Sequence, residues 1–239
     1  MKQAFQKLFK DTIKVDQVRF YYLLLFLISY YLFFLKKKNE KKKKKKKMEY
    51  EITHIERIEN EKLWNKYATE KRLMYKKLMD YQREFSDFNP DILTTQSNWM
   101  ELCDSNFPLE SEVNEVFLFH NTKMECISII KETGVELALG NIDGQFEPGI
   151  QFNEDPTLNH NHSFDSTTSH YNLFICRVLL GEAKTVTVEE LKTKKAPPLM
   201  NGSTQRYDSI VGDEKGPRQF VIYNGYQAYP EFLVSYTLK

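Results

Sequence analysis

The sequence predicts an α+β fold with a largely antiparallel sheet, because helical patterns come early in the chain and strand patterns come late. Apolar residues recur near helical spacing between residues 52 and 81, with Asn60 as a candidate N-cap before Glu61. Short runs of β-branched and aromatic residues dominate from residue 116 onward. A length of 239 residues fits one domain with an appendage, and an aromatic content of 14% is enough for a sizeable core.

The early apolar stripe is interpreted as an amphipathic helix whose apolar face points toward the core. Its members are Ile55, Ile58, Leu63, Trp64, Tyr67, Leu73, Met74, Leu78 and Tyr81. Residues 85–107 are polar and interrupted by Asn89-Pro90, so we expect a mixture of loop and short helix there.

Strand character follows in five short segments of the second half of the chain. They cover residues 116–119, 173–180, 185–188, 220–223 and 232–236. A short helix is predicted over residues 125–132 and ends at Gly134.

Charge divides the chain into two parts, and we place the domain boundary between residues 1–47 and residues 48–239. The first part holds 15 Lys/Arg against 3 Asp/Glu, a balance of +12, whereas the second holds the remaining 19 against 30, a balance of −11. An acidic body argues against broad nucleic-acid binding, which needs a basic footprint. We therefore expect no specific nucleic-acid partner.

The N-terminal part resembles a membrane anchor. Residues 20–35 are sixteen residues without a charge, ten lysines follow within residues 36–47, and a spanning helix needs about 20 apolar residues. We predict an N-terminal hydrophobic helix, membrane contact through residues 18–47, and a body that faces the cytosol by the positive-inside rule. The alternative is a buried or disordered extension, and the lysine tract is a solvated linker in either case.

Cysteine and histidine usage indicates neither a disulfide framework nor a metal site. The chain has an odd number of cysteines and no CxxC pair, which favours free thiols in a reducing compartment. The cysteines are Cys103, Cys126 and Cys176. The spacing of His160, His162 and His170 does not match a tight zinc pattern, so no metal is expected.

Four stretches, in order, resemble the catalytic domain of the poly(ADP-ribose) polymerase family. Residues 55–67 are similar to its "I-x-R-I-x-N-x-x-L-W-x-x-Y" lead-in, and residues 118–122 are similar to "LFHGT". Residues 149–152 are similar to the start of "GIYFA". The last stretch, from Tyr207 to Phe232, resembles the "YDSVV…FVIY…QAYPEYL" ending of mono-transferring members. The resemblance implies the ADP-ribosyltransferase fold, a split, mainly antiparallel sheet with flanking helices.

The resemblance also implies a histidine-tyrosine-glutamate set that here reads His120, Gln151 and Gln219. In the family, the histidine bonds a ribose hydroxyl, and the glycine after it meets the nicotinamide amide through its backbone. His120 and Thr122 match this motif, whereas Asn121 replaces the glycine. Gln219 stands at the glutamate and can bond a ribose hydroxyl, but it is uncharged and cannot act as a general base.

The nicotinamide-binding positions of the family are also substituted here. Gln151 replaces the tyrosine that stacks on the nicotinamide ring, and a carboxamide has no ring face. Asn159 stands where a serine often bonds the amide, and His162 stands at the second stacking tyrosine.

The resemblance therefore implies transfer of single ADP-ribose units from NAD+ to a protein acceptor, with release of nicotinamide. NAD+ is the co-substrate in this interpretation. The replacements leave two alternatives, an inactive relative that binds NAD, ADP-ribose or a protein partner, and a purely scaffolding role.

Overall fold

The computed structural model describes residues 50–81, 108–136, 149–158, 160–187, 189–190, 196–212 and 217–238. The N-terminal hydrophobic helix predicted within residues 1–47 lies outside these ranges and stays a prediction. Within the described ranges, no helix combines the length and the apolar character that crossing a membrane requires.

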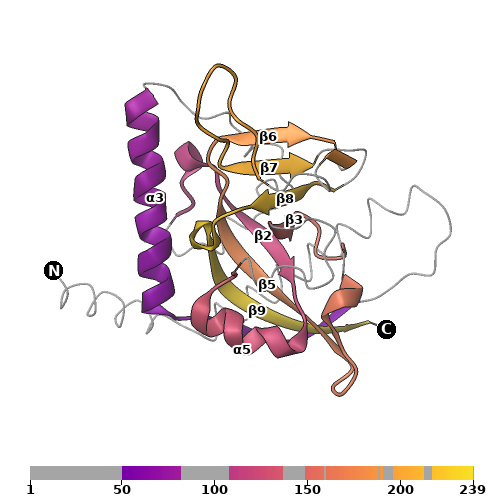
Figure 1. Cartoon of the computed structure of the whole chain (residues 1–239). Helices are drawn as coiled ribbons and strands as arrows, with labels where there is room; N and C mark the ends of the chain where they lie inside the picture. The colour runs from indigo at the N-terminus through magenta and orange to yellow at the C-terminus, as the bar shows by residue number, and fades with distance from the viewer. Residues whose placement is uncertain are drawn as a thin grey trace, which may run out of the picture.

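A nine-stranded sheet forms the centre of the body, in the order β1-β9-β5-β2-β3-β8-β7-β6, with β4 paired to β5 (Figure 1). Every strand pair in the described ranges is antiparallel except β6 with β7. The predicted, mainly antiparallel sheet is confirmed. The strands are β1 (Tyr50–Arg57), β2 (Glu115–Asn121), β3 (Ile150–Asn153), β4 (Phe164–Asp165), β5 (His170–Leu179), β6 (Ala183–Val186), β7 (Ser209–Gly212), β8 (Gln219–Ile222) and β9 (Ala228–Leu238).

The sheet is split between β2 and β3. These two neighbours share a single register pair, Phe119 with Asn153, whereas β2 pairs with β5 over seven residues from Glu115 to Asn121. A four-strand half, β1-β9-β5-β2, therefore joins the β3-β8-β7-β6 half through one rung.

Helix α3 (Glu61–Tyr81) begins where the sequence predicts, because Asn60 caps it. The Asn60 Oδ1 atom accepts a hydrogen bond from the Leu63 main-chain N–H at 3.1 Å, and this satisfies one of the donors that a helix start leaves open. The Asn60 Nδ2 atom also donates to the main-chain oxygen of Lys131 at 3.0 Å, so the cap ties the start of α3 to the segment that holds Lys131.

The predicted helical stripe was wrong before residue 60. Ile55 lies in β1 rather than in a helix, and Ile58 follows that strand. A register irregularity between Ile52 and His54 shifts the spacing of the inward-facing residues Ile52 and Ile55 from two to three. A bulge adds one residue to a strand, and here it imitates the three-residue spacing of a helix.

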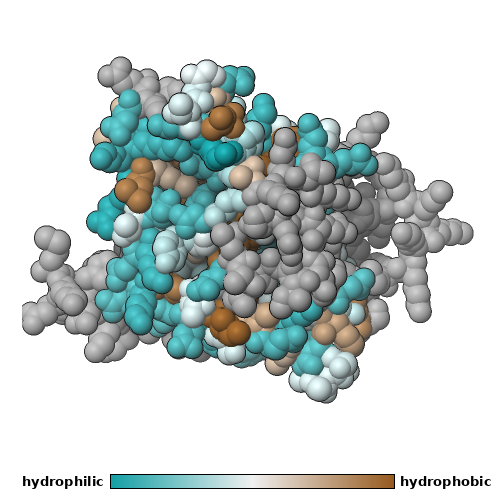
Figure 2. Space-filling view, in the orientation of Figure 1, coloured by the Kyte–Doolittle hydropathy of each residue, from teal (hydrophilic) through white to brown (hydrophobic). Residues whose placement is uncertain are grey.

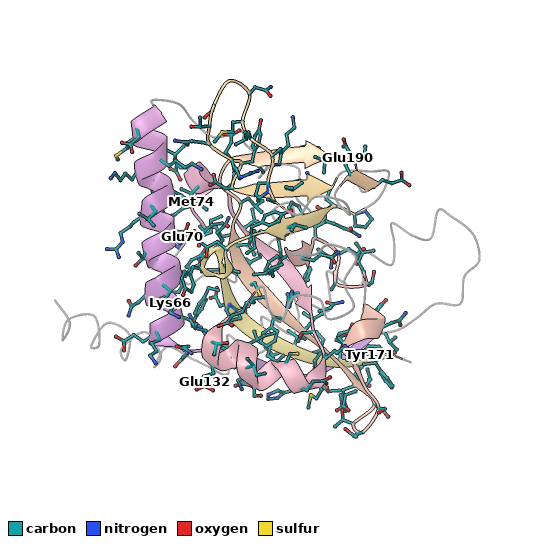
Figure 3. The ribbon with its side chains drawn as sticks, viewed as in Figure 1. Lys66, Glu70, Met74, Glu132, Tyr171 and Glu190 are labelled. Atoms are coloured by element: carbon teal, nitrogen blue, oxygen red, sulfur yellow. The ribbon has the colours of Figure 1, made fainter. Side chains whose placement is uncertain are left out.

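Helix α3 stands along one end of the strands, at the left in Figure 1. Its Leu63, Tyr67 and Met74 are buried against Val113 and Tyr229. Figure 3 shows Lys66, Glu70 and Met74, spaced four residues apart, following one another along α3. The Lys66 Nζ atom lies 4.9 Å from the centroid of the Tyr226 ring in the turn η5 (Gly225–Gln227).

Four charged side chains gather where α3 meets the sheet, three of them buried and the fourth, that of Lys71, partly buried. Arg177 donates through Nε to Glu231 Oε2 at 2.5 Å and through Nη1 to Glu115 Oε1 at 3.5 Å. Lys71 Nζ lies 3.0 Å from Glu115 Oε2, and the Tyr67 hydroxyl donates to Glu115 Oε1 at 2.6 Å. Buried charges of this kind are tolerated only when paired, and here each carboxylate faces a cation. We call these residues the ion network.

Helix α5 (Met124–Thr133) lies below the strands in Figure 1 and ends at Gly134, as predicted. Gly134 has φ 91°, and its N–H bonds the Ile130 carbonyl, a conformation that favours glycine. Ile130 is fully buried in the main core between this helix and the sheet.

On the face shown in Figure 2, the described residues are mostly hydrophilic and the apolar ones are scattered. Single exposed apolar residues are normal on soluble domains and indicate no docking face. They are Leu73, Met79, Met124, Ile129, Phe164, Leu199 and Tyr226.

Candidate functional site

His120 is the second-to-last residue of strand β2, at the split between the two halves of the sheet. Its Nδ1 atom lies 2.9 Å from the main-chain oxygen of Gln151 in β3. The ring is 7% exposed, and its centroid lies 5.4 Å from that of Phe152. The imidazole therefore bridges β2 and β3 at the place where the next rung of their ladder would form.

This contact determines how the His120 ring can interact with a ligand. A carbonyl oxygen only accepts, so Nδ1 must carry the proton and donate to Gln151. Burial lowers the pKa of His120 below 6.5, against the opposing effect of that main-chain bond, so the ring is neutral at physiological pH. Nε2 is then a hydrogen-bond acceptor, suited to a hydroxyl donor such as that of a ribose.

Three carboxamide side chains lie together on one face of β3 and β8. Asn153 is directly opposite Gln219 in the β3–β8 ladder, and Gln151 is two residues before Asn153 in the same strand. Residues that pair across a ladder, and residues two apart in a strand, share a face. We call Gln151, Asn153 and Gln219 the carboxamide face.

Each side chain of the carboxamide face has one buried polar atom without a hydrogen-bond partner among the described residues, although only Asn153 is buried as a whole. Within the described ranges, Gln151 Nε2, Asn153 Oδ1 and Gln219 Oε1 each make no hydrogen bond although solvent hardly reaches them. Such orphaned groups are rare in folded proteins, because each costs the free energy of its lost hydration. Their gathering on one face indicates a place where an external ligand supplies the missing partners.

The structure therefore brings the three predicted catalytic residues to one junction, but not to one face. The pleat puts the His120 ring beside Phe152, whereas the Gln151 and Gln219 side chains lie on the other side of β3. His120 reaches Gln151 only through its main chain. A ligand that contacts all three must lie across the end of β2, where the sheet splits.

Asn121, the residue at the family's glycine position, ties the end of β2 to the segment after β3. Its Nδ2 atom donates to the main-chain oxygen of Leu158 at 2.7 Å, while its Oδ1 atom has no hydrogen-bond partner among the described residues. Its backbone is ordinary β-strand, and its φ is not among the positive values of the described non-glycine residues. Neighbouring Thr122 is buried, at 7% exposure.

A buried ion pair closes the ladder next to the carboxamide face. Glu154 follows Asn153, and Arg218 precedes Gln219. Arg218 donates from its main-chain N–H to Glu154 Oε1 at 2.6 Å and from Nη2 to Glu154 Oε2 at 3.2 Å. Because this pair fixes both strand ends, it holds Asn153 and Gln219 opposite each other.

Gly149 has a steric role at the start of β3. A Cβ atom placed on it would come within 2.1 Å of Val221 Cγ1 in β8. Only glycine permits this approach, which explains the glycine that opens the "GIQF" stretch.

Two predicted ligand-binding residues cannot be placed as side chains. Asn159 lies outside the described residues, and so does the side chain of His162, whose backbone belongs to the short helix η4 (His160–Ser163). Conversely, Asn153 is not among the predicted site residues, although it is 3% exposed and its Oδ1 atom has no hydrogen-bond partner within the described ranges. The available signal was the strand period of two, which puts Asn153 on the same face as Gln151.

Apart from Gln219, several motif residues of the C-terminal stretch build the scaffold rather than the site. Asp208 accepts from the Glu182 main-chain N–H at 2.9 Å, and Gln227 Nε2 donates to the main-chain oxygen of Leu179 at 3.0 Å. Glu231 belongs to the ion network. These motif residues therefore connect the two halves of the sheet and α3 to each other.

The described cysteines are free, and Cys103 lies outside the described residues. Burial raises the pKa of the Cys176 thiol far above its usual range, which keeps that thiol inert. Among the described residues, no group of three or more His, Cys, Asp or Glu is arranged to hold a metal ion.

The split antiparallel sheet and the motif residues at its junction define a member of a known enzyme family. The model of the poly(ADP-ribose) polymerase catalytic domain matches residues 34–238, and the chain belongs to this family. It is 31% identical over 193 residues, 80% of its length, to a Dictyostelium discoideum protein named as a probable poly(ADP-ribose) polymerase.

Relatives named as mono-ADP-ribosyltransferases are also similar. The mouse protein mono-ADP-ribosyltransferase PARP12 is 30% identical over 128 residues, which cover 53% of this chain and 17% of that protein. The human PARP11 is 26% identical over 146 residues, covering 52% of this chain and 42% of that protein. The chain spans 45% of the Dictyostelium relative, so it corresponds to less than half of each of these three proteins.

Proposed function

We propose that this chain transfers single ADP-ribose units from NAD+ to a protein acceptor and releases nicotinamide. The observation that carries the proposal is the set of orphaned side-chain atoms at the split of the sheet, within a domain of this family. The names of PARP12 and PARP11, both mono-ADP-ribosyltransferases, give further support.

In the proposed reaction, the bond between the ribose C1′ and the nicotinamide nitrogen breaks, and its electron pair stays with nicotinamide. A nucleophilic side chain of the acceptor forms the new bond to C1′, and its proton leaves to solvent. Positive charge develops on the ribose ring in between, so binding and orientation of the ribose are the main tasks of the protein.

The residues present fit NAD+ as a substrate. Neutral His120 offers Nε2 as an acceptor for a ribose hydroxyl, because its Nδ1 is committed to Gln151. Gln219 offers the orphaned Oε1 to another hydroxyl, and Gln151 offers the orphaned Nε2 to a ligand oxygen. The triad of this chain is accordingly His120, Gln151 and Gln219, and each of the three offers the ligand a neutral hydrogen bond.

Gln219 also limits the proposed reaction to single transfer. A carboxamide carries no charge, so it cannot accept the proton of an incoming ribose hydroxyl, a form of assistance worth about 10²–10⁴ in rate. Elongation of a chain of ADP-ribose units requires activation of such a hydroxyl. We therefore expect one unit per acceptor site.

The direct test is to incubate the chain with NAD+ labelled on its adenosine part and to measure label on protein. We expect label on the chain itself or on proteins of an added lysate, as discrete bands without the smear of polymers. Absence of transfer under all conditions, with a folded chain, would refute the proposal.

The second candidate is an inactive module that binds NAD+ or ADP-ribose. The neutrality of the carboxamide face favours this inactive module. None of the three side chains carries a negative charge that would stabilise the oxocarbenium electrostatically. Gln219→Glu separates the two candidates. A transferase should gain rate from the added carboxylate, whereas a module without a functional reaction centre should bind NAD+ and show no transfer in either form.

We further propose that residues 18–47 tether the domain to the cytosolic side of a membrane. The sixteen uncharged residues 20–35 and the ten lysines that follow support this proposal. The test is flotation of the whole chain with vesicles that contain phosphatidylserine. A variant with the lysines of residues 41–47 replaced by serine should float less, and equal flotation would count against the polybasic contribution.

A further inference from the structure

The structure assigns a ligand-binding role to Asn153, which with Gln219 forms a pair of neutral acceptors for the vicinal hydroxyls of a ribose. This inference rests on the proposed function and adds a residue to its site. Asn153 is 3% exposed, and its Oδ1 atom has no hydrogen-bond partner within the described part of the chain. A polar side chain buried to this degree normally has a partner.

The geometry of the ladder makes Asn153 and Gln219 act together. They are register partners in the antiparallel β3–β8 pair, so their Cβ atoms are about 4.5–5.5 Å apart on one face. Both present an orphaned acceptor oxygen, Oδ1 in Asn153 and Oε1 in Gln219. Two acceptors side by side suit two neighbouring donors.

A ribose offers such donors. Its 2′- and 3′-hydroxyls are on adjacent carbons, and each hydroxyl has one proton to donate. The nicotinamide amide and the adenine amino group also donate, but their two protons are on a single nitrogen, and phosphates at neutral pH mainly accept. The carboxamide face therefore selects a vicinal diol over the other parts of a dinucleotide.

The strand ends that hold this pair are fixed, which favours a role in binding over a role in packing. The Glu154–Arg218 ion pair lies directly beside Asn153 and Gln219, at 3.2 Å between Oε2 and Nη2. Orphaned oxygens held in this rigid frame do not stabilise the free fold; they are preorganised for a ligand. The motif "GIYFA", which residues 149–152 resemble, has alanine at the position of Asn153. The acceptor oxygen of Asn153 is therefore not part of that motif.

The test compares the whole chain with Asn153→Leu, which keeps the branched shape but removes the acceptor, and with Asn153→Asp, which keeps an acceptor. The ligands are NAD+, nicotinamide mononucleotide, AMP and nicotinamide, with affinities measured by calorimetry. We expect Asn153→Leu to bind NAD+ about three- to tenfold more weakly, the effect of one lost hydrogen bond. Asn153→Asp should bind it at least as tightly as the unmodified chain.

The other ligands identify the ribose and exclude a structural effect. A loss with nicotinamide mononucleotide assigns the contact to the nicotinamide ribose, and a loss with AMP assigns it to the adenosine ribose. Nicotinamide, which lacks a ribose, should bind both variants equally. The melting temperature of free Asn153→Leu should not fall, because an unsatisfied acceptor is removed.

Equal NAD+ affinity for Asn153→Leu and the unmodified chain overturns this inference but leaves the proposed function intact. An equal loss for nicotinamide also overturns it, because the effect would then not depend on hydroxyls. Failure of the unmodified chain to bind NAD+ would overturn both.

Discussion

The ion network and the carboxamide face bury polar groups in opposite ways. In the ion network every charged group has a partner, as the contacts of Glu115, Arg177 and Glu231 show. On the carboxamide face the groups are neutral, and three of their atoms have no partner among the described residues. Charges are costly to bury and must be paired, whereas a neutral amide can be left open at a smaller cost. The ion network therefore stabilises the fold, whereas the carboxamide face leaves polar atoms available to bind a ligand.

The largest effect is expected from the ion network. Arg177→Met leaves the buried carboxylates of Glu115 and Glu231 facing each other without their shared cation. Removal of one partner from a buried ion pair costs about 3–5 kcal/mol of unfolding free energy. Unfolding in urea, followed by circular dichroism, measures this loss.

Gln151→Met is the matched control, since it also exchanges a polar side chain for an unbranched apolar one. It removes an orphaned donor, so it should leave the unfolding free energy unchanged or raise it. Similar losses for Arg177→Met and Gln151→Met would break the distinction between the two regions.

The second prediction concerns His120, which belongs to neither region but joins the two halves of the sheet. His120→Ala removes the Nε2 acceptor and the bond to the Gln151 main chain, so the ribose contact and the position of β3 are both lost. We expect the rate of transfer from labelled NAD+ to fall on the order of a hundredfold, which is the cost of misplacing the reactants by about 1 Å. Activity equal to that of the unmodified chain would refute the assignment of His120 to the site.

The third prediction uses the pH dependence of stability. Burial lowers the pKa of His120 in the folded chain below 6.5, so the unfolded chain takes up the proton first as the pH falls. Stability contributed by this group is therefore present above pH 6.5 and is lost as the pH falls from there through the folded pKa.

Melting temperatures between about pH 7.5 and about pH 5 measure this loss, and His120→Asn is the comparison because its side chain does not titrate there. The other histidines are the same in both chains, so their contributions cancel in the difference. The unmodified chain should lose more stability than His120→Asn over this range. Parallel curves would show that His120 is not buried in its neutral form.

Local rules predicted much of this fold, and non-local contacts account for what they missed. The cap at Asn60 and the end of α5 at Gly134 follow from neighbouring residues alone. The bulge in β1 depends on pairing with β9, near the other end of the chain, so Ile55 was assigned to a helix. The partners of Arg177 in the ion network are 54 and 62 residues away, beyond any local pattern.

The site shows the same limit. Motif comparison pointed to His120, Gln151 and Gln219, and the structure brings all three to the split. Asn153 was missed because motif comparison examines positions with known roles, and its significance depends on facing Gln219 across a ladder. The bond from Asn121 to Leu158 was also not predictable, since it joins the end of β2 to a turn after β3 that only the folded sheet brings near.

The smallest effect is expected from Gln219→Ala, which tests how little a neutral member of the carboxamide face contributes. It removes one hydrogen bond between Oε1 and a ligand hydroxyl, so transfer should fall only about three- to tenfold. The same assay with labelled NAD+ measures this change, and the melting temperature of the variant reports on folding. A loss as large as that of His120→Ala would mean that Gln219 does more than accept one bond. The carboxamide face would then act in the reaction itself, and the difference between charged scaffold and neutral ligand site would no longer describe this chain.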